Sequence, residues 1–169
     1  MDDPTIEYAH EFSALVDAGN LVFQPFENNG EIIGPTVLSS GGGLFLLEFR
    51  AERGIVKCYA DGPRRVLALS GGPFPGGDPV HKVVRKFFYL QDFLRQNLRD
   101  EVHIQGSLVF PDCYVDFHHS KKFSPLNVNV IRLKFLSDYL KRKDQTRDKW
   151  KHLSAESCEE LRILLESLP

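Results

Sequence analysis

The sequence predicts a single α/β domain with a central mixed β-sheet flanked by helices. Three observations predict this class: β-rich segments follow one another over 31–69, a long amphipathic helix follows over 79–98, and strand-like segments return after it. A meander that continues through a helical crossover produces both strand directions in one sheet. The 169 residues, 42% apolar, suffice for one core, and about four to six strands are expected.

The first elements are a helix and a series of short strands. Apolar residues at three- and four-residue spacing predict a helix in TIEYAHEFSALVDAGN, which Gly19 ends. The segment LVFQPF is strand-like, but Pro25 interrupts it. The segments EIIGPTVLSS and LFLLEFR are separated by GGG and predict a hairpin. A third strand, GIVKCYAD, is followed by a turn and by RRVLALS, which is expected to pair with it.

The helix over 79–98 is the clearest element of the sequence. Asp78 is placed to cap it, and Pro79 stands at the first helical position, where proline is favoured. We expect its broad apolar stripe to pack on the sheet. The stripe consists of Val80, Val83, Val84, Phe87, Leu90, Leu94 and Leu98.

The last third of the chain combines strands and helices. VHIQGSLVFPD predicts a strand, and CYVDFHHSKKFSPLN an irregular connection with a short β piece. VNVIRLKFLSDYLKRK changes from alternating to helical apolar spacing near Leu133. Beyond a charged break, Ser154 caps a last helix, with Ser157 as an alternative. We expect a domain over 1–143, and the break and helix of 144–169 to pack on it; docking of that helix onto a partner chain is the alternative.

The order of these segments resembles the nuclease-related domain (NERD) family, a branch of the restriction-endonuclease-like PD-(D/E)xK superfamily. The resemblance covers about Glu7 to Lys141 and rests on AHEF, GEIIGPTVLSSGGGLFLLEFR, the glycine of ERGIV, GDPVHKVVRKFFYLQDFL, SLVFPD and VNVIRLKFLSDYL. It implies a Mg²⁺ site where two strands part, with an aspartate from one and Glu-x-Lys from the next. Mg²⁺ prefers oxygen ligands and activates water, and residues separated by one position share a strand face.

The resemblance also assigns positions in this chain. Glu48 falls at the Glu position, Arg50 at the Lys position, and Glu11 matches an acid that the first helix contributes in the family. Arginine keeps the positive charge but cannot accept a proton. From the residues alone three interpretations of Glu48 and Arg50 stay open: a salt bridge at the sheet margin, a degenerate nuclease site, or a working one.

The aspartate position departs from the family pattern. It falls at Ile33 or Gly34, neither of which can ligate a metal, and Glu31 lies two or three positions early. The resemblance therefore implies a catalytically degenerate module that needs no cofactor. The alternative is an active Mg²⁺-dependent nuclease in which Glu48 and a migrated Glu31 hold the ion.

Basic residues suggest a partner. They are Lys82, Arg85 and Lys86 on the 79–98 helix, and Lys121 and Lys122 in a later loop. Lys and Arg are the usual phosphate contacts, although any amphipathic helix needs a polar face. The net charge of −2 provides no overall field for nucleic acid. We therefore predict local nucleic-acid binding, or a place in a nucleic-acid-processing assembly; the alternative is a structural subunit that binds only protein.

Other function classes find little support. The cysteines Cys58, Cys113 and Cys158 are far apart and form no CxxC pair, which argues against disulfides and zinc. His118 and His119 match no zinc spacing and predict a surface turn. The sequence has no phosphate-binding glycine motif and no apolar segment of membrane-spanning length. We expect an intracellular protein, in the cytoplasm or in the nucleoid or nucleus.

Overall fold

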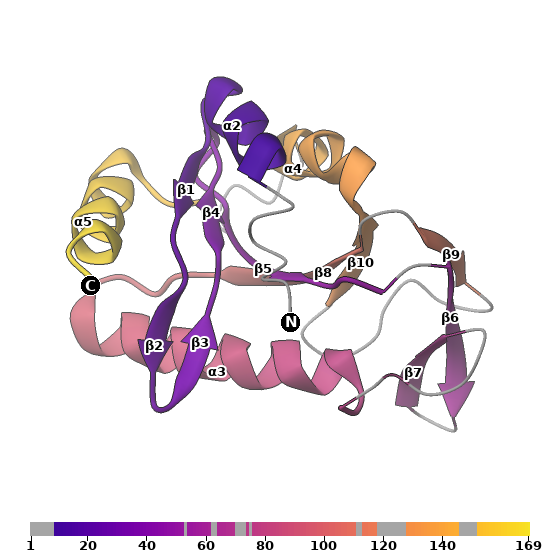
Figure 1. Ribbon diagram of the computed structural model, residues 1–169. Helices are drawn as coiled ribbons and strands as arrows, with labels where there is room; N and C mark the ends of the chain where they lie inside the picture. The colour runs from indigo at the N-terminus through magenta and orange to yellow at the C-terminus, as the bar shows by residue number, and fades with distance from the viewer. Residues whose placement is uncertain are drawn as a thin grey trace.

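The computed structural model describes residues 9–52, 54–61, 64–69, 74, 76–110, 113–117, 128–145 and 152–169. Its central sheet has five strands in the order β1-β4-β5-β8-β10. Their bounds are β1 Leu21–Phe23, β4 Thr36–Leu38, β5 Leu44–Phe49, β8 Ile104–Phe110 and β10 Asn129–Arg132. β4 is antiparallel to β1 and β5, whereas β8 is parallel to β5 and β10. The predicted α/β class with a mixed sheet is confirmed (Figure 1).

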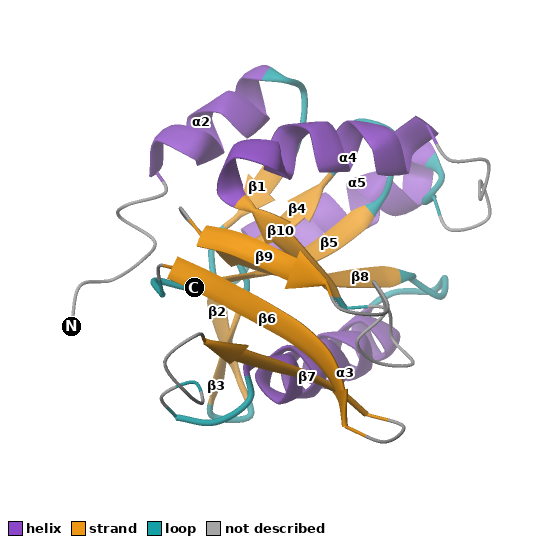
Figure 2. Ribbon diagram, turned by 90° about the vertical axis from the view of Figure 1, so that its right-hand side faces the viewer, coloured by secondary structure: helices purple, strands orange, loops and turns teal. Residues whose placement is uncertain are grey.

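Helices cover both faces of this sheet. On one face lie α2 (Ala9–Asp17) and α4 (Leu136–Gln145), which follows the short 3-10 helix η1 (Leu133–Phe135). On the other face α3 (Pro79–Asn97) runs below the strands, with α5 (Ala155–Glu166) beyond its end (Figures 1 and 2). The predicted change from strand to helix at Leu133 is confirmed. Within the described ranges, no helix is both long and apolar enough to cross a membrane.

The helix α3 forms the crossover that makes β5 and β8 parallel. The Asp78 carboxylate accepts a hydrogen bond from the backbone N–H of Val80 at 2.9 Å, as the sequence predicts. The predicted apolar stripe faces the core, since Val83 and Leu90 are fully buried. Gly106 of β8 allows a close approach, because a Cβ there would lie 3.0 Å from the Val83 side chain.

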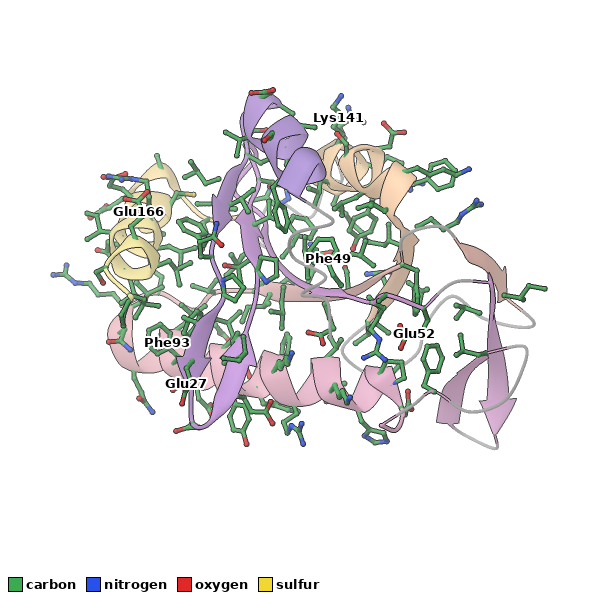
Figure 3. The ribbon with its side chains drawn as sticks, in the orientation of Figure 1. Glu27, Phe49, Glu52, Phe93, Lys141 and Glu166 are labelled. Atoms are coloured by element: carbon green, nitrogen blue, oxygen red, sulfur yellow. The ribbon has the colours of Figure 1, made fainter. Side chains whose placement is uncertain are left out.

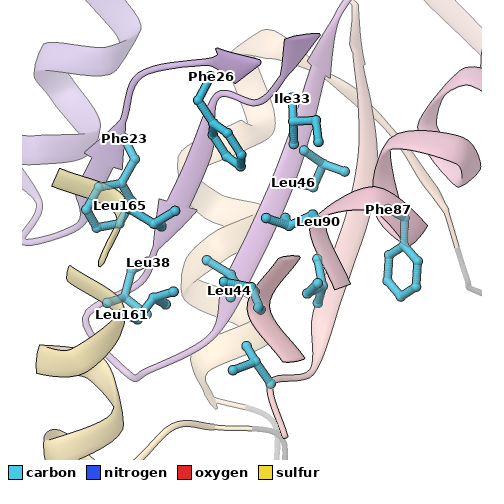
Figure 4. Packing of buried hydrophobic residues seen from close by; sticks show 13 residues of the cluster. Phe23, Phe26, Ile33, Leu38, Leu44, Leu46, Phe87, Leu90, Leu161 and Leu165 are labelled. Atoms are coloured by element: carbon cyan, nitrogen blue, oxygen red, sulfur yellow. The ribbon is translucent and has the colours of Figure 1, made fainter. Parts of the chain in front are cut away.

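The two faces of β5 belong to different parts of the core. Leu44 and Leu46 pack in the cluster that contains the C-terminal half of the α3 stripe, from Phe87 onward (Figure 4). Phe45 and Leu47 pack in a second cluster with side chains of α2 and α4. Because side chains alternate along a strand, Glu48 falls on the α3 face. It is also the one position of β5 that is not buried.

Two smaller sheets flank the central one. β2 (Phe26–Asn28) and β3 (Glu31–Ile33) form a ribbon, and β6 (Gly54–Asp61) lies between β7 (Arg64–Leu69) and β9 (Cys113–Phe117). The expected pairing of GIVKCYAD with RRVLALS is confirmed, but these strands do not extend the central meander. The reason is that β8 pairs along the whole of β5 after the α3 crossover.

The predicted hairpin between EIIGPTVLSS and LFLLEFR is present as β4 and β5, but the first segment breaks in two. Gly34 separates β3 from β4 with a φ of +109°, a conformation that L side chains rarely adopt. Pro35 follows and lacks a backbone donor. The strand is therefore interrupted here, and its two halves pair separately but in one register, β4 with β1 and β3 with β2.

The C-terminal helix packs against this same core. The Ser154 hydroxyl caps α5 by accepting a hydrogen bond from Ser157 N–H at 3.2 Å. Leu161 and Leu165 are buried in the cluster that includes the α3 stripe (Figure 4). The N–H of Leu153, just before the helix, donates to the Gly42 carbonyl in the β4–β5 turn at 2.8 Å.

Candidate functional site

Glu48 pairs with a lysine from the crossover helix. The Lys86 ammonium donates a hydrogen bond to Glu48 Oε2 at 2.7 Å. Both side chains are largely buried, with 14% of Glu48 and 15% of Lys86 exposed. A buried carboxylate needs such a partner, because an unpaired charge away from water is strongly destabilising. The carboxylate at the end of β5 is therefore half of an ion pair between the sheet and α3.

Arg50 has partners of its own. Its Nε donates to Glu52 Oε2 at 3.1 Å, a second guanidinium N–H donates to Glu52 Oε1, and the group lies 5.7 Å from the centre of the Phe74 ring. Its backbone N–H bonds the Val109 carbonyl at 2.9 Å. Figure 3 shows Phe49 at the end of β5 and Glu52 where the chain leaves the central sheet. The motif Glu48-x-Arg50 is thus divided between two ion pairs.

The position expected for the aspartate carries no carboxylate. Ile33 is fully buried in the α3-facing core. The β4–β5 register pairs Thr36 with Leu46, and continuing it brings Gly34 opposite Glu48. A Cβ on Gly34 would lie 3.3 Å from the Pro25 Cα, so an aspartate there faces steric crowding as well as the unfavourable φ. The backbone at Gly34 is shaped for glycine.

The other predicted acids lie apart from Glu48. Glu31 forms an ion pair with Arg85 of α3 at 2.8 Å, so each of the two candidate metal ligands already holds a cation of this helix. Glu11 belongs to α2, on the opposite face of the sheet, and its side chain lies outside the described residues. Within the ranges that the structure describes, no three His, Cys, Asp or Glu side chains form a group able to hold a metal ion.

The basic residues predicted to contact nucleic acid are only partly available. Arg85 and Lys86 are engaged with carboxylates, although Arg85 keeps 53% of its side chain exposed, and Lys82 is half-buried. Lys121 and Lys122 lie outside the described residues.

The surface turn predicted at His118 and His119 lies outside the described residues. Cys113 and Asp116 stand on β9, but their side chains are not described.

The position of Lys86 on its helix indicates that it is the partner of Glu48, although its basic character alone suggested a phosphate contact. Lys86 lies three residues after Val83 and four before Leu90, both fully buried on α3. Residues at these spacings share one side of a helix, so Lys86 borders the apolar stripe and points toward the sheet. A charge at such a place requires a buried counter-charge, and Glu48 is the acid that β5 presents to this face.

Comparisons with protein-family models, with curated proteins and with solved structures gave no match to this chain. The central features are a carboxylate neutralised by a helix ammonium and a glycine opposite it. Such a site can join the sheet to α3, and it offers the Glu48 oxygens to an ion only if Lys86 moves away.

Proposed function

We propose that this chain is a degenerate nuclease-fold module that binds nucleic acid without cleaving it. The resemblance to the NERD family implies a mixed sheet flanked by helices, with the Glu-x-Lys position at the end of a central strand. The order α2, antiparallel β1-β4-β5, crossover α3 and parallel β8 agrees with that expectation. Glu48 lies one residue before the end of β5 and faces the crossover helix.

The observation that carries the proposal is the Glu48–Lys86 ion pair. Metal-assisted phosphodiester hydrolysis requires carboxylates that converge on one ion, whose charge activates water. Lys86 holds its positive charge 2.7 Å from Glu48 Oε2, which neutralises the carboxylate and repels a divalent cation. With glycine at the opposing position, Glu48 lacks a second acid from β4. An ion pair thus stands where the family pattern calls for a metal centre.

One observation favours a second candidate function, an active Mg²⁺-dependent nuclease. Lys86 places an ammonium group beside Glu48, where the family has a lysine and this chain has Arg50. A lysine that loses its proton can orient or deprotonate a water molecule, whereas an arginine cannot. In that case Glu31 would have to leave Arg85 and enter the site as the second ligand. The degenerate module is preferred because both acids hold helix cations in the described arrangement.

A cleavage assay separates the two functions. The purified chain is incubated with single- and double-stranded DNA and RNA in Mg²⁺ or Mn²⁺, with a chelator control. Glu48→Gln keeps the side-chain shape and removes the charge, and Glu27→Gln is a matched control at an exposed acid on β2. We expect no metal-dependent cleavage by any of the three proteins. Cleavage that needs the metal and is lost only in Glu48→Gln contradicts the proposal.

Binding is measured in the same preparation without divalent metal. We expect fluorescence anisotropy to show that the chain binds a labelled oligonucleotide. The affinity should fall as the salt concentration rises, because phosphate contacts release counterions. If the folded chain binds no nucleic acid in this assay, the result would favour a subunit that binds only protein.

A further inference from the structure

Basic side chains gather on η1 and α4. Over 132–143 the chain has five basic residues and one acid, Asp138, although its overall charge is −2. We define the α4 surface as the side chains of Arg132, Lys134, Phe135, Lys141 and Arg142. Three of its cations, Lys134, Lys141 and Arg142, are exposed. Such a local reversal of charge is how an acidic protein presents a polyanion-binding surface.

These cations differ from those of α3 in their partners. On α3, Arg85 pairs with Glu31, and Arg95 with Glu101 at 3.8 Å. Among the described residues, none of the α4-surface cations forms an ion pair with a carboxylate. Asp144, at the end of α4, accepts hydrogen bonds from Ser39 and Gly41. The positive charges of Lys134, Lys141 and Arg142 therefore face no carboxylate partner among the described residues.

An aromatic ring stands among these cations. Phe135 is 45% exposed, and its ring lies 5.4 Å from the Arg132 guanidinium carbon and 5.1 Å from the Lys134 ammonium. The buried Nε of Arg132 has no hydrogen-bond partner in the described structure, so the ring is its principal contact. Cation–π attraction holds both charges near the ring.

The α4 surface lies away from the Glu48–Lys86 pair. Helix α4 covers the sheet face opposite α3, and Lys141 extends outward from it (Figures 1 and 3). Lys134 and Lys141 are seven residues apart, about two helical turns or roughly 10 Å, and so share one side of the segment.

We propose that the α4 surface binds single-stranded nucleic acid. A base stacks on Phe135, while Lys134, Lys141 and Arg142 contact the phosphates on either side. An exposed ring flanked by cations fits an unpaired base, whose face is accessible, better than a duplex, whose bases are stacked on one another. The ligand class rests on the proposed function, but the surface does not depend on the state of the Glu48 site.

The stacking contact is tested with Phe135→Ala and Phe135→Tyr in the full-length chain. A labelled single-stranded oligonucleotide and its duplex are titrated and followed by anisotropy. Phe135→Ala should weaken single-strand binding about tenfold with little change in salt dependence, since one base loses its platform. Phe135→Tyr keeps an aromatic face and should bind like the parent. Circular dichroism and the melting temperature show that each variant is folded.

The phosphate contacts are tested by neutral substitutions. Lys134→Gln with Lys141→Gln should reduce the slope of log affinity against log salt by about 1.4, because each single-strand contact contributes about 0.7. Lys82→Gln with Arg85→Gln removes the same charge from the α3 surface that the sequence favoured, and should weaken binding much less than the α4 double variant. Asp138→Asn removes the single acid of this segment and should strengthen binding.

Several results would overturn the α4 assignment. One is an equal loss of affinity in the α3 and α4 double variants. Another is preferred binding of the duplex with the same affinity in the parent and in Phe135→Ala. A third is binding of anionic lipid vesicles by a chain that does not bind the oligonucleotide. Cleavage that depends on Glu48 would refute the degenerate-nuclease proposal and leave these binding results untouched. Oligonucleotide binding lost in the α4 variants, together with no cleavage, supports both proposals.

Discussion

The Glu48–Lys86 pair allows a quantitative test of how this site differs from a metal centre. Lys86→Met removes the ammonium and keeps most of the side-chain volume. Two opposite charges 2.7 Å apart attract by about 6 kcal/mol at an effective dielectric of about 20, and desolvation offsets much of this. Breaking a buried pair costs about 3–5 kcal/mol. With 14–15% of each side chain exposed, water lowers the expected loss to about 2–4 kcal/mol.

The double variant separates the pair from its single charges. Glu48→Leu combined with Lys86→Met replaces both charges by apolar groups in a largely buried place. We expect it to unfold within about 1 kcal/mol of the parent, because apolar replacements of a whole buried ion pair are often neutral. If Glu48→Leu alone costs as much as Lys86→Met, the double-mutant cycle should then give a coupling energy of about 3 kcal/mol or more, because the double variant regains most of what the two single variants lose. The free energies of unfolding come from urea titrations followed by circular dichroism.

An exposed ion pair that also involves α3 provides the control. Arg95 and Glu101 are 3.8 Å apart, with 56% and 81% of their side chains exposed. Their cycle, made with Arg95→Met and Glu101→Leu, should give less than about 1 kcal/mol, as exposed ion pairs do. The reasoning fails if both cycles give the same coupling. It also fails if the Glu48/Lys86 double variant is as unstable as the less stable single variant.

Two further predictions concern the core and the alkaline limit of stability. Leu161→Ala should lower the free energy of unfolding by about 2–5 kcal/mol, because Leu161 is fully buried. The control Ile163→Ala should change it by less than about 0.5 kcal/mol, because 57% of the Ile163 side chain is exposed. Equal losses in urea titrations would contradict the packing of α5. Burial raises the pKa of Tyr139 above its usual 10.0, against the opposing effects of Ser107, Arg142 and Asn129. The unfolded chain therefore ionises first, so this stabilisation is complete below about pH 10 and is lost as pH rises through the folded pKa. Tyr139→Phe should reduce the fall in the free energy of unfolding between about pH 9 and pH 11. If the free energy falls as steeply with pH in the variant as in the parent, Tyr139 is not the source of the alkaline instability.

Much of the secondary structure could be predicted because it depends on local patterns. The Asp78 and Ser154 caps act on N–H groups two and three residues away, and both are present. The apolar spacing of α3 correctly identified its buried side. The strand-to-helix change near Leu133 follows from spacing within one segment.

The candidate site was harder to predict because its partners are distant in sequence. Glu48 was identified as the unusual charge of a buried strand, but Lys86, its partner, is 38 positions away. The sequence favoured Lys86 as a phosphate contact because it is basic. Its spacing to Val83 and Leu90 indicates the side of α3 that faces the sheet, but only the packing of α3 against β5 shows that Glu48 is its partner. The α4 surface was missed because its residues are ordinary along the chain, and the exposure of Phe135 depends on how η1 leaves the sheet.

By itself, the sequence determined the elements, their caps and their apolar faces, because periodicity and capping involve groups within one or two turns. The tertiary structure decided which strands share a sheet: β8 pairs along β5, and β6 joins β7 and β9. It also decided which charges are neutralised. The physical reason is the same in both cases. A pattern states that a face must be covered or a charge balanced, but which distant residue does so depends on the packing of the whole chain.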